Sequence, residues 1–335
     1  MTIGEAVFRA KKCLEAHQVP DYGIDALLLL QYVSGISRAE YFAHQDAEYP
    51  DAERYLELVS LRAKRIPLQQ ITGETYFCAL RFLVTEDVLC PRQETELLVE
   101  EALKRIPPGG RFLDLCTGSG CIAVSLLCLG NNLSGCGCDL SEDALRIASS
   151  NARLHHVTAH LELRQGDLYD ALSGETGSAA CPSGLVDAPM RRNIDAPAEG
   201  WDGHLQGNLD GPAEGCDEPL RRNIDAPADE YDMIVSNPPY IASDKIAGLM
   251  EEVRDHEPVM ALDGGADGLV FYRRILEGAD KYLKRGGWLL VEIGYDQAGA
   301  VRSMFGDYRY ESVRVIKDLA GLDRIVLVQR GNLCV

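Results

Sequence analysis

The chain has 335 residues, of which 46% are hydrophobic and 25% charged, a composition ordinary for a globular protein with room for two domains. Its formal net charge of −19 argues against a dedicated nucleic-acid binder, because phosphate backbones attract basic surfaces. The 11 cysteines are odd in number, which predicts reduced thiols and not a disulfide framework. The sequence shows no targeting pattern and no apolar run near the ~20 residues that a membrane span needs, so we expect a cytoplasmic protein away from membranes.

Residues 1–65 predict a small helical domain. Thr2-Ile3-Gly4-Glu5 and Ser37-Arg38-Ala39-Glu40 follow the capping-box pattern of a helix start. A further amphipathic stretch has apolar residues at helical spacing, namely Tyr55, Leu58, Val59 and Leu61. Such a domain can either stabilise the rest of the chain or offer a docking surface to a macromolecule.

Residues 66–90 predict a β connector. Pro67 ends the preceding helix and Gly73 marks a turn. Phe82, Val84 and Val88 indicate short strands.

From about residue 91 to 335, strands alternate with helices. The predicted strands are 111–116, 133–138, 161–164, 231–236, 288–293, 310–316 and 325–329, with helices at 121–129, 141–155 and 268–283. This βαβ alternation predicts an α/β fold with a doubly wound sheet.

Residues 170–229 interrupt that alternation. The segment holds 12 acidic and 4 basic residues, six prolines and eight glycines, and the eight residues from Arg191 to Ala198 recur at 221–228. It has no periodicity, so it cannot bury enough apolar area to offset its chain entropy. We expect an acidic, poorly ordered insertion between two strands.

A polar turn, Asn237-Pro238-Pro239-Tyr240, follows the apolar strand predicted at 231–236. Ligands of open α/β sheets bind at the carboxyl ends of the strands. Proline lacks an N–H group and stiffens the turn, so the Asn237 side-chain oxygen and the Pro238 carbonyl remain as acceptors beside the ring of Tyr240. This arrangement suits a planar amide or exocyclic amine that has two N–H bonds to donate.

The strand predicted at 111–116 enters a glycine-rich turn, Asp114-Leu115-Cys116-Thr117-Gly118-Ser119-Gly120, and then a helix. Glycines permit close backbone approach to a ligand, and Asp139, 19 residues after Gly120, ends the next strand where it can bind ribose hydroxyls. Gly118 to Ala123 also matches the dinucleotide pattern G-x-G-x-x-A, which leaves an NAD enzyme as an alternative. Asp114, which can meet a cationic amino-acid group, and the Asn237 turn both count against hydride transfer.

Two weaker patterns accompany these turns. Asp167 and Leu168 end the third predicted strand, where the carboxylate can accept from an adenine amine and Leu168 can cover the ring, although aspartate after a strand is often only a turn residue. Pro91-Arg92-Gln93-Glu94-Thr95-Glu96 opens a helix; its acids suit the helix dipole, and a role in closing over a cofactor is the alternative. The histidines lack metal-ligand spacing, and we expect no metal site.

Together these residues resemble the class I S-adenosylmethionine methyltransferases, and more narrowly the HemK/PrmC family of peptide chain release factor glutamine N5-methyltransferases. The resemblance covers residues 1–170 and 230–330 and includes His256-Glu257-Pro258 and Glu292-Ile293-Gly294. It implies a seven-stranded, mostly parallel sheet, S-adenosyl-L-methionine as cofactor with S-adenosyl-L-homocysteine as product, and a monomer whose residues 1–65 dock the release factor. The cofactor-binding residues it implies are Asp114, Cys116, Thr117, Gly118, Ser119, Gly120, Asp139, Leu140, Asp167, Leu168 and Asn237. The implied substrate-binding residues are Asn237, Pro238, Pro239 and Tyr240, with Asn237, Pro238 and Tyr240 catalytic.

The sequence departs from the family pattern at three positions. Cys116 stands where many members have glycine, Gln93 replaces a common proline, and Leu168 stands where an aromatic residue often covers adenine. Three other functions stay open: a ribosomal-protein glutamine methyltransferase, an adenine N6-methyltransferase on nucleic acid, and a cofactor-binding scaffold without activity. The charge and the lack of a recognition domain disfavour the second, and the intact Asn237 turn disfavours the third.

Overall fold

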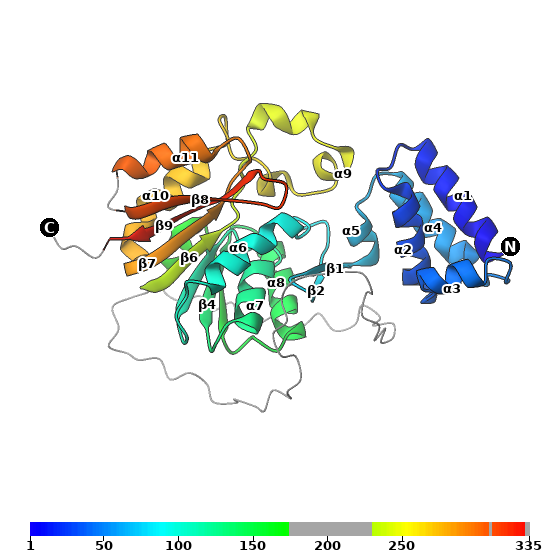
Figure 1. Ribbon diagram of the computed structural model, residues 1–335, viewed down its shortest axis with the longest axis horizontal. Coiled ribbons are helices and arrows are strands. Elements are labelled where there is room, and N and C mark those ends of the chain that lie inside the picture. The colour runs from blue at the N-terminus through cyan, green and yellow to red at the C-terminus, as the bar shows by residue number, and fades with distance from the viewer. Residues whose placement is uncertain (174–229, 308–309, 332–335) are drawn as a thin grey trace.

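The computed structural model describes residues 1–173, 230–307 and 310–331. A group of N-terminal helices, a two-stranded hairpin and a seven-stranded sheet flanked by helices follow one another along the chain (Figure 1). From residue 174 onward, the predicted insertion lies outside the described residues. Residues 168–172, which include its predicted start, form the short 3-10 helix η1 (Leu168–Leu172).

The N-terminal helices are α1 (Ile3–Ala16), α2 (Tyr22–Ser34), α3 (Arg38–Ala43), α4 (Ala52–Ala63) and α5 (Leu68–Thr72). Both predicted capping boxes are confirmed, with Thr2 and Ser37 at the N-caps of α1 and α3. Tyr55 is buried among the helices, and its hydroxyl donates to the Ala26 carbonyl at 2.9 Å. Leu61, predicted to share this buried face, is 36% exposed, because α4 turns it away from the core.

The hairpin pairs β1 (Glu74–Phe77) with β2 (Leu80–Leu83) in antiparallel register. Gly73 ends α5 with φ of 76°, a conformation that glycine adopts without strain. The prediction that Val84 and Val88 lie in strands was wrong. Both follow the hairpin as buried loop residues that pack against Ala144.

The large sheet confirms the predicted doubly wound fold. Its strands are β3 (Arg111–Leu115), β4 (Ser134–Asp139), β5 (Leu161–Gln165), β6 (Tyr231–Ser236), β7 (Leu283–Glu292), β8 (Tyr310–Lys317) and β9 (Asp323–Arg330), in the order β5-β4-β3-β6-β7-β9-β8. The pairs from β5 to β7 are parallel, and β9 pairs antiparallel with both β7 and β8. The chain runs outward from β3 to β5 and returns to β6 on the other side of β3, which creates a switch point of the kind where ligands bind.

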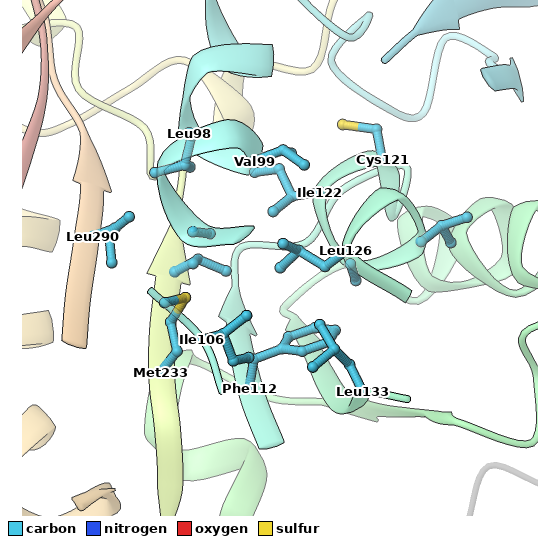
Figure 2. Packing of buried hydrophobic residues seen from close by; sticks show 14 of the residues in the cluster. Leu98, Val99, Ile106, Phe112, Cys121, Ile122, Leu126, Leu133, Met233 and Leu290 are labelled. Carbon is cyan, nitrogen blue, oxygen red and sulfur yellow. The ribbon is translucent and has the colours of Figure 1, made fainter. Parts of the chain in front are cut away.

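Helices cover both faces of this sheet. One face packs on α6 (Gln93–Leu103), α7 (Cys121–Leu129) and α8 (Glu142–Leu154), and the other on α10 (Val270–Tyr282) and α11 (Ala298–Met304). Successive strand residues point to opposite faces of the sheet. Phe112 and Met233 therefore join the first cluster (Figure 2), and their neighbours Leu113 and Ile234 join the second. Because helices cover both faces of the sheet, the central parallel strands are apolar along nearly their whole length.

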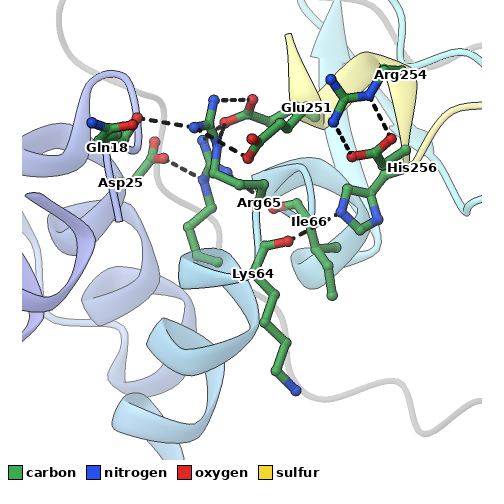
Figure 3. Close-up of polar contacts among 11 residues, drawn as sticks. Gln18, Asp25, Lys64, Arg65, Ile66, Glu251, Arg254 and His256 are labelled. Atoms are coloured by element: carbon green, nitrogen blue, oxygen red, sulfur yellow. Dashed lines mark hydrogen bonds and ion pairs between the residues drawn. The ribbon is translucent and has the colours of Figure 1, made fainter. Parts of the chain in front are cut away.

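A buried ion cluster joins the N-terminal helices to the segment between β6 and α10 (Figure 3). That segment contains η2 (Ser243–Gly248), α9 (Glu251–Arg254) and η3 (Val259–Ala261). Arg62 and Arg65 both donate to Glu252 of α9, and Arg62 also donates to Asp25 at 2.7 Å. The helical region is therefore tied to the stretch of chain that follows the Asn237 turn.

Within the described residues, no helix combines the length and apolarity that crossing a membrane requires.

Candidate active site

A cavity lies at the carboxyl ends of β3, β4 and β6. Six predicted site residues line it: Cys116, Thr117, Gly118, Ser119, Asp139 and Asn237. They come from three neighbouring strands, as expected for ligands at the switch point of a doubly wound sheet.

The turn after β3 brings backbone close to the cavity. Gly118 and Gly120 have φ of 55° and 77°, in the left-handed region that favours glycine. A Cβ on Gly120 would lie 3.0 Å from the Cβ of Ala148 in α8, so glycine also permits the close packing of the turn on that helix. Thr117, Gly118 and Ser119 thereby reach the cavity wall.

Asp139 is held rigidly at the end of β4. Its two carboxylate oxygens accept from the backbone N–H groups of Gly118, at 2.8 Å, and Ser141, at 2.9 Å. Burial raises the pKa of Asp139, while these backbone bonds act in the opposite direction. Each oxygen keeps a further lone pair, which can accept from a hydroxyl group in the cavity.

Asp114 lies beneath the loop. It is fully buried, does not line the cavity, and accepts from the Thr117 hydroxyl at 2.6 Å. Burial raises the pKa of Asp114 to about 7. Asp114 therefore fixes Thr117 and the turn through Oδ2, while its other oxygen, Oδ1, has no hydrogen-bond partner. Its contact with a cationic ligand group stays a prediction.

Cys116 has φ of 60°, a left-handed conformation that costs a non-glycine residue about 1–2 kcal/mol. We expect Cys116→Gly to change the free energy of unfolding by less than about 1 kcal/mol, since relief of strain offsets the greater chain entropy of glycine. Cys116→Val should destabilise by about 2 kcal/mol, because a β-branched residue is strained at positive φ. Urea unfolding measures the free energy of unfolding of the two variants. Equal values for Cys116→Gly and Cys116→Val would contradict backbone strain at this position.

Asn237 follows β6 and faces the cavity. Its side-chain nitrogen Nδ2 donates to Thr95 Oγ1 at 3.2 Å, which leaves Oδ1 as an acceptor. Ser236, the last residue of β6, donates its hydroxyl to the Leu115 carbonyl at 2.7 Å and so fixes the strand end against β3.

The rest of the turn is supported from behind. Pro238 and Pro239 are buried, and Tyr240 is half-buried. The Tyr240 carbonyl accepts from Gln297 Nε2 at 2.9 Å. Burial raises the pKa of Tyr240 to about 12, so its phenol is neutral at physiological pH. The turn is thus a rigid, neutral element beside the cavity.

Asp167 and Leu168, two predicted site residues, are not among the residues that line the cavity. Asp167 forms an ion pair with Arg274, with 2.9 Å between Oδ1 and Nη2. Leu168 is 5% exposed and packs in the core cluster on the α10 and α11 face of the sheet, and its contact with an adenine ring stays a prediction. The other predicted site residues are also absent from the lining: Gly120, Leu140, Pro238, Pro239 and Tyr240.

Several lining residues were missed by sequence reasoning. They come from the loop after the hairpin, the starts of α7 and α8, and η3: Asp87, Val88, Leu89, Cys121, Ile122, Ser141, Ala144 and Met260. Pro258 and Ala261, which belong to the family resemblance, also line the cavity. The predicted helix start at 91–96 contributes Pro91, Arg92 and Thr95, which favours its role at the cavity over capping alone. Arg92 is anchored there by its ion pair with the buried Glu257 at 2.6 Å. Loops carry no periodic pattern, and only the resemblance pointed to residues 256–262.

Known proteins match this chain along nearly its whole length. A family model described as the PrmC N-terminal domain matches residues 5–73, and one described as the methyltransferase small domain matches residues 92–177. The release factor glutamine methyltransferase of Clostridium acetobutylicum is 32% identical, with 99% of this chain and 100% of that protein covered. Proteins of the same name from Cereibacter sphaeroides (36% identical, 97% and 98% covered) and Geobacter sulfurreducens (37%, 80% and 75%) are also similar. The chain belongs to the release factor glutamine methyltransferase family.

The cofactor of this family is S-adenosylmethionine. The donor set fits that molecule. Asp139 presents carboxylate oxygens suited to ribose hydroxyls, and the turn at 116–119 presents backbone beside them. Among the described residues, no group of three or more His, Cys, Asp or Glu side chains could hold a metal ion.

Proposed function

We propose that this chain transfers a methyl group from S-adenosylmethionine to the side-chain amide nitrogen of the glutamine in the Gly-Gly-Gln loop of peptide chain release factors. The observation that carries the proposal is the orientation of Asn237. Its nitrogen is engaged by Thr95, so its oxygen is the group left to bind an amide N–H at the cavity. The names of the similar full-length proteins support the choice of substrate.

Binding the cofactor falls to the residues of the switch point. Asp139 would hold the ribose, and Thr117, Gly118 and Ser119 would lie along the rest of the molecule. When bound, the cofactor supplies a methyl group made electrophilic by the attached sulfonium. Asp114 acts indirectly, since it holds the Thr117 hydroxyl.

The turn at Asn237 would orient the target nitrogen. An amide nitrogen is a weak nucleophile, because its lone pair is delocalised into the carbonyl group. Asn237 Oδ1 and the Pro238 carbonyl would accept its two N–H bonds, which directs the nitrogen and stabilises positive charge as it develops. Tyr240 would pack against the amide plane, and the proton would leave to water. Positioning and electrostatics account for catalysis in this scheme.

Docking of the release factor would use the N-terminal helices. Ile24, Leu28 and Tyr32 are 60%, 44% and 41% exposed and recur every four residues along α2. Residues at this spacing lie on one side of a helix, so they form an exposed apolar stripe. Such a stripe can hold the body of a protein substrate while its flexible loop enters the cavity.

Replacing both Ile24 and Leu28 by aspartate should raise KM for the release factor about tenfold or more, because two apolar contacts would become desolvated charges. The Kd for S-adenosylmethionine should stay within about twofold, since neither residue lines the cavity. Steady-state kinetics and calorimetry measure the two quantities. Leu319→Asp, at an exposed position on a turn between β8 and β9, is the matched control. An unchanged KM would refute docking on α2.

Mass spectrometry tests the reaction itself. The protein is incubated with a release factor and S-adenosylmethionine, and the Gly-Gly-Gln peptide is analysed. A gain of one methyl group on the glutamine is expected. Methylation of a ribosomal protein with none on the release factor would overturn the substrate, and methylation of adenine in nucleic acid would overturn the substrate class.

A further inference from the structure

Two buried polar residues lie behind Asn237. Thr95, in the first turn of α6, and Glu292, the last residue of β7, are each 2% exposed. Strands β6 and β7 are parallel neighbours with Ser236 beside Val291, so Asn237 and Glu292 follow at the same edge of the sheet. Helix α6 packs on this part of the sheet and brings Thr95 to Asn237.

The hydrogen-bond direction through these three residues is determined by their chemistry. Thr95 lowers the pKa of the Glu292 carboxyl, against the rise that burial causes, so the two side chains lie close together. The single hydrogen of the Thr95 hydroxyl can be donated to the ionised carboxylate, which has no hydrogen of its own to donate. Thr95 Oγ1 is then an acceptor toward Asn237, so only the nitrogen side of the Asn237 amide can face it, as the 3.2 Å contact shows. If the Asn237 amide were reversed, its oxygen Oδ1 would face Thr95 Oγ1, and both atoms would be acceptors with no hydrogen between them.

We propose that Thr95 and Glu292 are positioning residues that hold the Asn237 amide with its oxygen toward the substrate. The pair does not touch the reacting atoms. It selects one of the two near-isosteric orientations of the amide, and only this orientation offers an acceptor to the target nitrogen. The inference rests on the proposed function, since it assigns Asn237 as the acceptor for the substrate amide.

The arrangement makes the amide orientation sensitive to the charge of Glu292. Burial raises the pKa of Glu292 to about 7, and one of its oxygens, Oε2, has no hydrogen-bond partner. A protonated Glu292 can donate to Thr95, whose own hydrogen then turns toward Asn237 and favours the reversed amide. Charged and titratable groups from every neighbouring element act on Glu292: Arg92, Glu94, Cys121, Tyr240, Tyr272 and Arg324.

Variants at Thr95 test the positioning role. Thr95→Val keeps the shape and removes the hydroxyl; we expect kcat to fall about 10- to 100-fold with the Kd for S-adenosylmethionine within about threefold. Thr95→Ser should recover kcat to within about threefold of the parent, because the hydroxyl is restored. Thr75→Val on β1, outside the cavity lining, is the matched control and should leave both constants unchanged. Thermal melting establishes that each variant is folded.

The pH profile supplies a readout that a merely structural role would not move. In the parent, kcat should decline as pH falls through about 7, when Glu292 gains its proton. Glu292→Gln offers Thr95 an acceptor oxygen that does not titrate, so this acid limb should disappear. An unchanged acid limb in Glu292→Gln, or parent-like kcat in Thr95→Val, would overturn the inference.

Combining variants separates this inference from the proposed function. Asn237→Ala/Thr95→Val should be no slower than Asn237→Ala alone, since Thr95 acts through Asn237. If Asn237→Ala is as active as the parent, the proposed function fails. If Asn237→Ala is slow and Thr95→Val is not, only the positioning role fails.

Discussion

Asn237→Ala should lower kcat about 10²- to 10³-fold, the loss typical of removing one preorganised hydrogen-bonding group that acts in the transition state. The substrate amide would lose the acceptor that directs its nitrogen, and developing positive charge would lose the oxygen facing it. The Kd for S-adenosylmethionine should rise by less than about threefold, because Asp139 and the turn at 116–119 remain.

Single-turnover kinetics measures the chemical step, and calorimetry measures cofactor binding. Asn131→Ala, at an exposed position before β4, removes the same side chain away from the cavity lining and should behave like the parent. A loss of cofactor affinity as large as the loss of rate would show that Asn237 serves cofactor binding, and the assignment would have to be withdrawn.

The sequence was sufficient to predict the groups that end strands. Parallel strands of a doubly wound sheet present their carboxyl ends at one edge, so Asp139 and Asn237 could be placed together without knowing the strand order. Local chemistry also marked Gly118 and Gly120, whose positive φ values a turn of this kind requires.

What the sequence could not supply was decided by tertiary packing. Asp114 is fully buried in the central strand and accepts from the Thr117 hydroxyl, a contact that an acid before a glycine turn does not reveal in the sequence. Thr95 sits in an ordinary helix start, and its contact spans 142 residues to Asn237. Asp87 belongs to a loop and Met260 to the three-residue helix η3, and neither segment is long enough to show a hydrophobic period in the sequence.

Arg62→Ala should lower the free energy of unfolding by about 3–5 kcal/mol, because removing one member of a buried ion pair leaves the other charge uncompensated. Arg62 is 5% exposed and donates to Asp25 at 2.7 Å and to Glu252 at 3.0 Å (Figure 3). Glu252 would keep Arg65, whereas Asp25 would lose its guanidinium partner. Chemical denaturation followed by circular dichroism measures the change.

Arg54→Ala is the matched control on the same helix, since its pair with Glu57 is 63% and 58% exposed and should contribute less than about 0.5 kcal/mol.

The loss of stability in Arg62→Ala should also depend on pH. Burial already raises the pKa of Asp25 above its usual range, and Arg62 opposes that rise. Without Arg62 the carboxylate is disfavoured further in the folded state, so the loss should be greatest above that pKa and shrink toward acid pH as Asp25 protonates. In an Asp25→Asn background the same substitution should cost less, because no buried charge is left behind. Equal losses in the two backgrounds would mean that Arg62 stabilises the junction through Glu252 and packing, and not through Asp25.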